Sequence, residues 1–424
     1  MIDIEHLRNN PELYIRACTL KRIKLDIPAL LQVDAAYRTA KTNVEMRRSE
    51  SNAFNKQLPS LKGAERDAKL LEMKSFSSIT KELEAQLSKI DLERNLLLLR
   101  VPGIPLSKVP DGASDADNQE VNRVGEIPQF SFKIKSHAEL GVDLDIIDTE
   151  RAVKIAGSRA YFLKGDGARL QHALMNFAID FVAKKKYVLM DPPHIVRREV
   201  MEGTGYFPGG EDQAYHLDER DTDFHLIGTA EVPVAAYHSG EILAAAKLPL
   251  RYCGYSPCYR REAGTYGKDT AGLYRVHQFY KIEQVIICKN DAEESARLHS
   301  ELLSNSEVLL QALGLPYRVV NVCTGDMGQG QIFKNDIETW MPSRKAFGET
   351  HSCSTFHDFQ ARRLNLKYRD ADGKTQFCHT LNNTLAASPR LLIPLLEVHQ
   401  QSDGRVMIPH ALRPYMGGQE FIGQ

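Results

Sequence analysis

The stretch from about residue 26 to residue 100 constrains the fold most, because its pattern is that of two long helices. Charged residues and strong helix formers dominate it, whereas aromatic residues and glycine are scarce. Apolar residues recur at helical spacing in both halves: Leu30, Val33, Tyr37, Val44, then Ile79, Leu83, Leu87, Ile90 and Leu97. Strong helix breakers separate the two runs at 59–63. The sequence therefore predicts two helices of about 30 residues joined by a short turn, an antiparallel coiled-coil hairpin ~45 Å long.

The apolar stripe on each of these helices is narrow. A narrow stripe buries little area, so the hairpin is expected to protrude from the rest of the protein as an arm over residues 28–98. The alternative is a helix pair that packs flat on the globular part of the chain.

The composition excludes several classes of protein. The chain has 424 residues, enough for two or three domains, and its 42% hydrophobic content excludes a disordered or collagen-like chain. Its 54 basic and 55 acidic residues nearly cancel, which excludes a histone-like polymer binder but allows a local basic patch. No stretch approaches the roughly 20 apolar residues of a membrane span, and the N-terminus lacks the apolar core of a secretion signal. Seven cysteines without framework spacing favour reduced thiols, so we expect a cytoplasmic protein without a membrane segment.

A polar stretch rich in proline and glycine at 101–118 predicts a linker between an N-terminal domain, 1–110, and a C-terminal domain, 111–424. The second domain contains amphipathic helical patterns at 167–184 and 291–313. Strand-like runs lie at 187–190, 249–255, 279–288, 317–322 and 339–341. Successive strands with short turns favour an antiparallel sheet with flanking helices, so the predicted fold class is α+β.

The densest group of chemically capable residues lies at 258–285. Arg260 and Glu262 end one predicted strand, a polar loop follows at 263–272, and the chain then returns as a second strand. The period of two places alternate residues from 275 to 283 on one face, among them Arg275, Phe279 and Glu283. An arginine, an aromatic ring and a carboxylate together can clamp a phosphate, stack on a base and hold an ammonium group. The alternative is a surface hairpin whose charges pair across the strands.

A second group lies at 224–233. Thr229 and Glu231 are two residues apart, so in a strand they would face the same side and meet Glu283 across a pocket. Two carboxylates and a hydroxyl suit a small zwitterion that carries a hydroxyl group. The alternative is an exposed strand end.

A third group, at 348–363, offers ligands for a metal ion. Glu349 and Ser352 provide hard oxygen ligands of the kind that Mg²⁺ accepts beside a nucleotide. The competing hypothesis is a zinc site, but its candidate ligands match no structural-zinc spacing: His351, Cys353 and His357.

A fourth group, at 380–418, includes a predicted helix from about 387 to 400 with Arg390 near its N-terminal end. An arginine there adds full charge to a position that already favours anions, although a solvated arginine is the simpler alternative. Neither a GxxxxGK[ST] loop nor a GxGxxG fingerprint occurs in the sequence, so an ordinary nucleotide-binding α/β fold is not indicated.

These four groups, in this order, resemble the signature motifs of class II aminoacyl-tRNA synthetases, and the helical arm narrows the resemblance to the seryl-tRNA synthetase family. The likeness runs over nearly the whole chain and includes further segments: MIDI at 1–4, DNQE at 117–120, GSRAYFL at 157–163, MEGTG at 201–205 and TAE at 229–231. It implies a class II catalytic core and a ligase that activates L-serine with ATP to seryl-adenylate and transfers it to the 3′ end of tRNA(Ser).

The resemblance also assigns the site residues. Serine would be bound by Thr229, Ala230, Glu231, Glu283 and Thr384. ATP would be bound by Arg260, Arg261, Glu262, Arg275, Val276, Phe279, Glu349, Thr350, His351, Ser352 and Arg390. Within this set, Glu349 and Ser352 would hold Mg²⁺, and Arg260 and Arg390 would be the catalytic residues.

The same resemblance implies partners beyond the small substrates. The helix at 167–185 with Pro193 is similar to the motif that forms the homodimer interface in class II synthetases. The arm would bind tRNA(Ser), and also tRNA(Sec), by following backbone phosphates with its Lys and Arg side chains.

Three positions depart from the family pattern. Gly228 stands where proline is frequent, Thr384 stands where a serine usually helps to bind the substrate side chain, and NNTL at 382–385 replaces a more glycine-rich run. The added bulk is expected to tighten the serine pocket.

Three other functions are consistent with parts of the sequence. A related enzyme that activates an amino acid for a carrier protein would not need the intact arm. A non-catalytic RNA-binding relative would have a broken ATP site, whereas its charged residues are all present: Arg260, Glu262, Arg275, Glu349 and Arg390. A coiled-coil scaffold would leave the ordered groups between 229 and 390 unexplained.

Overall fold

The computed structural model describes residues 2–217, 223–264 and 272–423. The chain divides into two compact units, Met1–Pro102 and Gly103–Gln424. Most of the loop predicted at 263–272 lies outside the described residues. In the part of the chain that is described, no helix combines the length and the apolar character needed to cross a bilayer.

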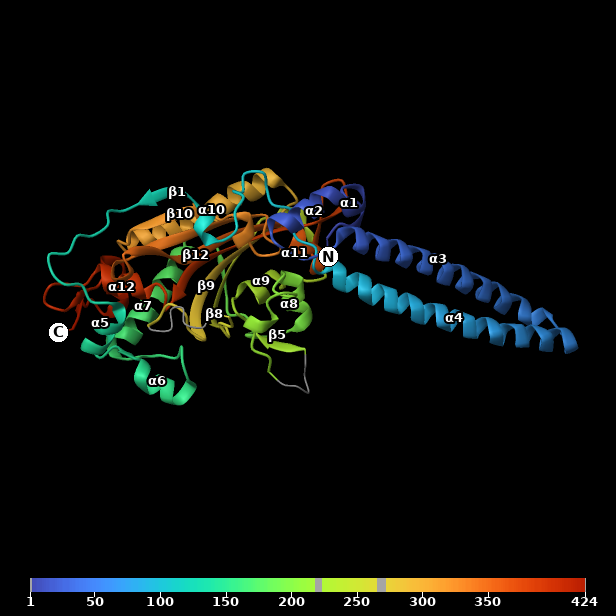
Figure 1. Ribbon diagram of the computed structural model, residues 1–424, viewed down its shortest axis with the longest axis horizontal. Coiled ribbons are helices and arrows are strands. Elements are labelled where there is room, and N and C mark those ends of the chain that lie inside the picture. Colours follow the sequence, from blue (N-terminus) through green and yellow to red (C-terminus); the bar gives the residue numbers. More distant parts are fainter. Residues whose placement is uncertain (1, 218–222, 265–271, 424) are drawn as a thin grey trace. The chain divides into compact units, whose positions relative to one another are not determined.

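The N-terminal unit is built on the two long helices expected from the sequence. Helix α3 spans Ile27–Gln57 and α4 spans Gly63–Leu98, with a 3₁₀ turn at Leu58–Ser60 between them. The two helices run antiparallel along each other (Figure 1), which confirms the predicted hairpin. Arg48 Nη2 and Glu84 Oε1 pair across the helices at 2.7 Å and mark their register.

Asp34 joins the base of this hairpin to the first helix of the chain. Its buried carboxylate accepts hydrogen bonds from Arg8 Nε and Arg94 Nε, each at 2.7 Å. Burial opposes ionisation, but the bonds from the two arginines keep the pKa of Asp34 below its usual value. Helices α1 (Ile4–Asn9), α3 and α4 are therefore held at one point by a single carboxylate.

The C-terminal unit is an α+β domain whose described residues form an eight-stranded sheet (Figure 1). In spatial order its strands are β1 (Gln119–Val124), β10 (Tyr317–Asn321), β11 (Phe333–Met341), β12 (Ala346–His357), β15 (His379–Ser388), β9 (Gln278–Cys288), β8 (Leu250–Tyr259) and β4 (Val188–Met190). Neighbouring strands run antiparallel, except that β4 and β8 are parallel. The predicted antiparallel sheet with flanking helices is thus confirmed.

The chain contains further helices and strands in both units. The helices are α2 (Pro11–Leu20), α5 (His137–Asp143), α6 (Thr149–Ala156), α7 (Gly165–Ala183), α8 (Arg198–Thr204), α9 (Glu231–Ala235), α10 (Ala292–Ala312), α11 (Phe359–Arg363) and α12 (Leu392–Val398). The remaining strands are β2 (Ile147–Asp148), β3 (Phe162–Leu163), β5 (Ile195–Arg197), β6 (Phe224–Leu226), β7 (Ile242–Ala244), β13 (Lys367–Arg369), β14 (Thr375–Phe377), β16 (Val406–Met407) and β17 (Phe421–Ile422). Helices α7 and α10 correspond to the two amphipathic patterns in the sequence.

Side chains along β9 point alternately to the two faces of the sheet. One face packs on the hydrophobic core, and we call the other the second face. Ile282 and Ile286 belong to the main hydrophobic core with residues of α7 and α10, and Gln284 Oε1 accepts a bond from Asn305 of α10 at 2.7 Å. The intervening residues Lys281 and Glu283 point to the other side of the sheet. That second face is where polar groups gather.

Three local expectations from the sequence are wrong. Thr229 and Glu231 do not lie in a strand: β6 ends at Leu226, and Glu231 begins α9. Thr229 Oγ1 accepts the Glu231 amide at 3.2 Å, a local bond that supports a turn rather than an extended chain.

The second error concerns Arg390, which precedes its helix rather than lying inside it. Strand β15 stays paired with β9 as far as Ser388, and α12 begins only at Leu392. Pro389 has no amide hydrogen to continue the ladder, so the strand ends there and Arg390 lies in the following turn. The third error concerns Arg275, which precedes β9 because that strand begins only at Gln278.

Candidate active site

A cavity of about 240 Å³ opens on the second face of the sheet, over β9, β12 and β15. It collects most of the residues that the sequence singled out: Glu231, Arg260, Glu262, Val276, Phe279, Glu283, Glu349, Thr350, Ser352, Thr384 and Arg390. The first and the last of these residues, Glu231 and Arg390, lie more than 150 positions apart in the chain. The topology of the sheet therefore brings them together.

Five of the expected residues do not line this cavity: Thr229, Ala230, Arg261, Arg275 and His351. Arg275 Nη1 lies 3.2 Å from Glu262 Oε2 and so supports a residue that does line it. The ring of His351 turns away, because its Nε2 donates to the carbonyl of Leu385 at 3.1 Å. The side chain of Arg261 is exposed.

His351 is also unsuited to the zinc site considered from the sequence. Its other ring nitrogen, Nδ1, lies 2.9 Å from Thr350 Oγ1, and burial lowers the pKa of the ring to about 4. Cys353 Sγ lies 3.6 Å from a different partner, His299 Nδ1. Across the described ranges, no group of three His, Cys, Asp or Glu side chains has the arrangement of a metal site.

One end of the cavity is acidic. Glu283 and Glu231 are both buried, and Lys281 Nζ pairs with Glu283 Oε2 at 2.6 Å. Thr384 Oγ1 donates to the same Glu283 oxygen at 3.3 Å. Gln360 Nε2 donates to Glu231 Oε1 at 2.8 Å. The charge of Lys281 therefore neutralises that of Glu283, whereas the amide of Gln360 donates an uncharged hydrogen bond to Glu231.

Glu231 has the most strongly perturbed carboxyl group at this end. Burial raises the pKa of Glu231 to about 7, and the neighbouring charge of Glu283 adds to the effect. A cationic group placed between the two carboxylates would offset both effects and favour the ionised form of Glu231. The acidic end is therefore suited to an ammonium group.

Another part of the same cavity, which we call its cationic end, contains two guanidinium groups. Arg260 lies over the ring of Phe279 at 5.2 Å, and its Nε donates to the carbonyl of Gly228 at 3.3 Å. Arg390 lies over the ring of Tyr274 at 4.6 Å, and its Nη1 donates to the carbonyl of Glu349 at 3.1 Å. Two guanidinium groups fixed by aromatic rings and backbone carbonyls provide a preorganised site for phosphate.

β-Bulges bring some of these side chains onto one face. Glu338 pairs with Glu349, but the preceding Ile337 pairs with His351, so Thr350 is an extra residue in β12. Without this bulge, Glu349 and Ser352 would point to opposite faces, because their spacing is three. A second bulge at Leu385 in β15 has the same effect, and both Thr384 and Ala387 line the cavity.

Several lining residues were missed at the sequence level: Tyr206, Lys281, Gln331, Lys334, Ser354 and Asn382. Lys281 was within reach of the sequence argument, since it lies two residues from both Phe279 and Glu283. Lys334 pairs with the buried Asp336 at 2.9 Å and brings a further positive charge to the cationic end. It had no sequence signal of its own, because isolated lysines usually lie on the surface.

Comparisons with known proteins point to one family. Residues 215–399 match the model of the class II tRNA synthetase core domain (G, H, P, S and T), and residues 1–105 match the seryl-tRNA synthetase N-terminal domain. The chain is 46% identical to a serine–tRNA ligase of Deinococcus radiodurans, across 100% of this chain and 99% of the relative.

Solved structures agree with the sequence matches. A seryl-tRNA synthetase from Pyrococcus horikoshii, crystallised with ATP, superposes with a TM-score of 0.89 at 37% identity and covers 100% of this chain and 99% of its own. A cytoplasmic serine–tRNA ligase from Naegleria fowleri in complex with AMP gives a TM-score of 0.83 at 32% identity, over 99% and 96% of the two chains. The chain therefore belongs to the seryl-tRNA synthetase family of class II aminoacyl-tRNA synthetases, and it is an ATP-binding serine–tRNA ligase.

Proposed function

We propose that serine binds at the acidic end of the cavity and ATP at the cationic end, so that the serine carboxylate meets the α-phosphate between them. One observation carries this assignment: a single cavity joins two buried carboxylates, Glu231 and Glu283, to the guanidinium groups of Arg260 and Arg390. Glu231 and Glu283 would hold the ammonium and hydroxyl groups of serine. Phe279 would stack on the adenine, and Glu262 would contact the base beside it.

The first chemical step needs no side chain that removes a proton. A substrate carboxylate is ionised at neutral pH and attacks the α-phosphorus in line, so that pyrophosphate leaves. The ribose hydroxyl at the 3′ end of the tRNA then attacks the carbonyl carbon of the adenylate, and AMP leaves. Catalysis by Arg260 and Arg390 consists of alignment and of neutralising the charge on the phosphate.

The donor set at the cationic end fits Mg²⁺. Glu349 and Ser352 lie on one face of β12 and present a carboxylate and a hydroxyl, the hard oxygens that this ion prefers. Partial desolvation disfavours the charge on Glu349, but Arg390 and Lys334 outweigh it and lower the pKa of the carboxyl group. An ion held here would shield the charge of the ATP phosphates.

The remaining partners are proposed from the rest of the chain. The hairpin α3–α4 would bind tRNA(Ser), and also tRNA(Sec), through backbone phosphates. A homodimer would form through the segment from α7 to Pro193. This segment includes β4, the terminal strand of the sheet, where Val188 and Leu189 are about half exposed. The enzyme would act in the cytoplasm.

The proposed substrate assignment is tested by ATP–pyrophosphate exchange without tRNA, measured with each of the twenty amino acids. Exchange with serine alone is expected. Exchange with a different amino acid would refute the assignment of the acidic end to serine. Absence of exchange with all twenty would instead favour a non-catalytic RNA-binding relative.

Serine binding is expected to weaken as the pH falls below about 7. The ammonium group requires the ionised form of Glu231, whose pKa is about 7 in the empty site. Only the ionised fraction binds, so the KM for serine should rise about tenfold between pH 8 and pH 6, while the KM for ATP changes little. Exchange kinetics over this range check the prediction, and Glu231→Gln should bind serine weakly without the same pH dependence. A flat serine KM in the wild-type enzyme would contradict it.

Replacement of Thr384 by glycine is expected to raise the activation of threonine relative to serine. Thr384 lines the cavity and is bonded to Glu283, so its methyl group occupies space beside the substrate side chain. One methyl group changes discrimination by roughly tenfold or more. The ratio of kcat/KM for the two amino acids in exchange measures the effect. Thr384→Ser removes the same methyl group but keeps the hydroxyl, so it should also raise the activation of threonine. An unchanged ratio in the glycine variant would refute the prediction.

A further inference from the structure

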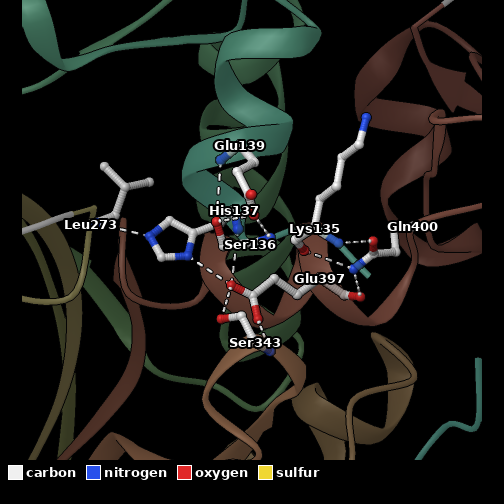
Figure 2. Close-up of polar contacts among 8 residues, drawn as sticks. All are labelled: Lys135, Ser136, His137, Glu139, Leu273, Ser343, Glu397 and Gln400. Atoms are coloured by element: carbon white, nitrogen blue, oxygen red, sulfur yellow. Dashed lines mark hydrogen bonds and ion pairs between the residues drawn. The ribbon is translucent and has the colours of Figure 1, made fainter. Parts of the chain in front are cut away.

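Another buried carboxylate, that of Glu397, lies outside the substrate site. Glu397 of α12 is fully buried, and its carboxylate receives four hydrogen bonds from two segments (Figure 2). His137 donates from its backbone amide at 2.9 Å and from Nδ1 at 2.8 Å. Ser343 donates from its amide at 2.9 Å and from Oγ at 2.8 Å. These bonds lower the pKa of Glu397 in spite of its burial, so the carboxylate is ionised at neutral pH.

The hydrogen bonds of His137 define which ring nitrogen carries the proton. Nε2 lies 3.1 Å from the backbone amide of Leu273, which can only donate (Figure 2). Nε2 must therefore be the unprotonated acceptor, and the proton lies on Nδ1, where it is donated to Glu397. The carboxylate thus orients the ring, and the ring holds a backbone amide.

This close approach of ring and backbone depends on Gly272. The residue has a φ of +78°, and a Cβ atom there would lie 2.2 Å from His137 Nε2. A side chain at this position would displace either the ring or the backbone segment that begins with Leu273. Position 272 therefore requires glycine for two reasons: its φ is positive, and the ring of His137 leaves no room for a Cβ atom.

The held backbone is a wall of the cavity at its cationic end. Leu273 and Tyr274 both line the cavity, and the carbonyl of Tyr274 accepts a bond from Arg390 Nε at 3.4 Å. The ring of Tyr274 lies under Arg390 at 4.6 Å and under Arg344 at 4.3 Å. Movement of Leu273 would therefore shift the groups that fix the guanidinium of Arg390.

We propose that His137 and Glu397 form a positioning pair that holds Leu273 and Tyr274, and through them Arg390, in place for ATP. The inference rests on the proposed assignment of ATP to the cationic end. Neither His137 nor Glu397 lines the cavity, so the pair acts on ATP binding without touching the substrate. The serine end, with Glu231 and Glu283, should be unaffected.

Two substitutions of His137 test its two hydrogen bonds one at a time: the bond to Glu397 and the bond from the amide of Leu273. His137→Asn retains a donor near the position of Nδ1 for Glu397 but has no atom at the position of Nε2. His137→Gln can extend an acceptor to the amide of Leu273. In serine-dependent exchange we expect His137→Asn to raise the KM for ATP three- to tenfold, the value of one lost hydrogen bond. The KM for serine should stay within twofold, and His137→Gln should recover most of the ATP affinity.

Gly272→Ala provides an independent route to the same effect, because it leaves both members of the pair intact and displaces the backbone that they hold. It should also raise the KM for ATP selectively. His238→Asn is the matched control: His238 bonds Glu241 through Nδ1 at 2.8 Å and Tyr252 through Nε2 at 2.7 Å, away from the cavity. It should leave both KM values unchanged.

The outcomes distinguish this inference from the assignment on which it rests. If the wild-type enzyme shows no serine-dependent exchange, the proposed assignment fails. If the wild type is active but His137→Asn and Gly272→Ala leave the KM for ATP unchanged, the positioning pair is refuted. A parallel rise in both KM values together with a lower melting temperature would show a general structural role and would also refute it.

Discussion

Replacement of Arg260 by alanine is expected to slow serine-dependent ATP–pyrophosphate exchange by about 10²–10³-fold, the cost of removing one preorganised group that stabilises transition-state charge. Arg260 lies in the cavity over Phe279 and is bonded to the carbonyl of Gly228, so its guanidinium is already in place before ATP binds. The loss should appear mainly in kcat, because the charge on the α-phosphate oxygens develops as the serine carboxylate attacks.

The adjacent arginine offers a matched comparison. Arg261 is exposed and does not line the cavity, so Arg261→Ala should change exchange by less than about threefold, as surface substitutions do. Arg260→Lys should recover only part of the rate, because an ammonium group lacks the planar fork of the guanidinium. Equal losses in the two alanine variants would contradict the assignment of Arg260 to the α-phosphate.

Removal of the arm is expected to abolish the charging of tRNA while sparing adenylate formation. Deletion of residues 28–98 tests this in its simplest form, but it also removes Asp34 and Arg94 from the base of the hairpin. The ion pair between Arg48 and Glu84 shows that these residues face each other, so residues 49–83 can be replaced by a short glycine linker. This variant keeps the buried cluster around Asp34.

In the shortened variant, charging of tRNA(Ser) should fall on the order of 10³-fold, since several phosphate contacts are lost together. Serine-dependent exchange should stay within about twofold of wild type, because every cavity residue lies in the other unit. Aminoacylation and exchange measured on the same preparation separate the two steps. An equal loss of both activities would contradict a role for the arm in binding tRNA.

The hairpin was predictable because its determinants are local. Apolar residues at helical spacing and a single group of breakers at 59–63 specify two helices, and the short turn between them specifies antiparallel pairing. The strands and helices of the second domain were also recognisable from local periodicity. The errors fell where local signals conflict, as at Glu231, which begins a helix, and at Arg390, which follows a strand end.

The sequence alone determined the helical hairpin, the α+β class and the identity of half of the residues that line the cavity, because these depend on periodicity and on motifs that are contiguous in the chain. The tertiary structure decided what no spacing reveals. The bulge at Thr350 turns Glu349 and Ser352 to one face, and Gln360 reaches Glu231 from another segment. His137 meets Glu397 across 260 positions. Such contacts are set by strand register and by the packing of distant segments, and both exist only after the whole sheet has formed.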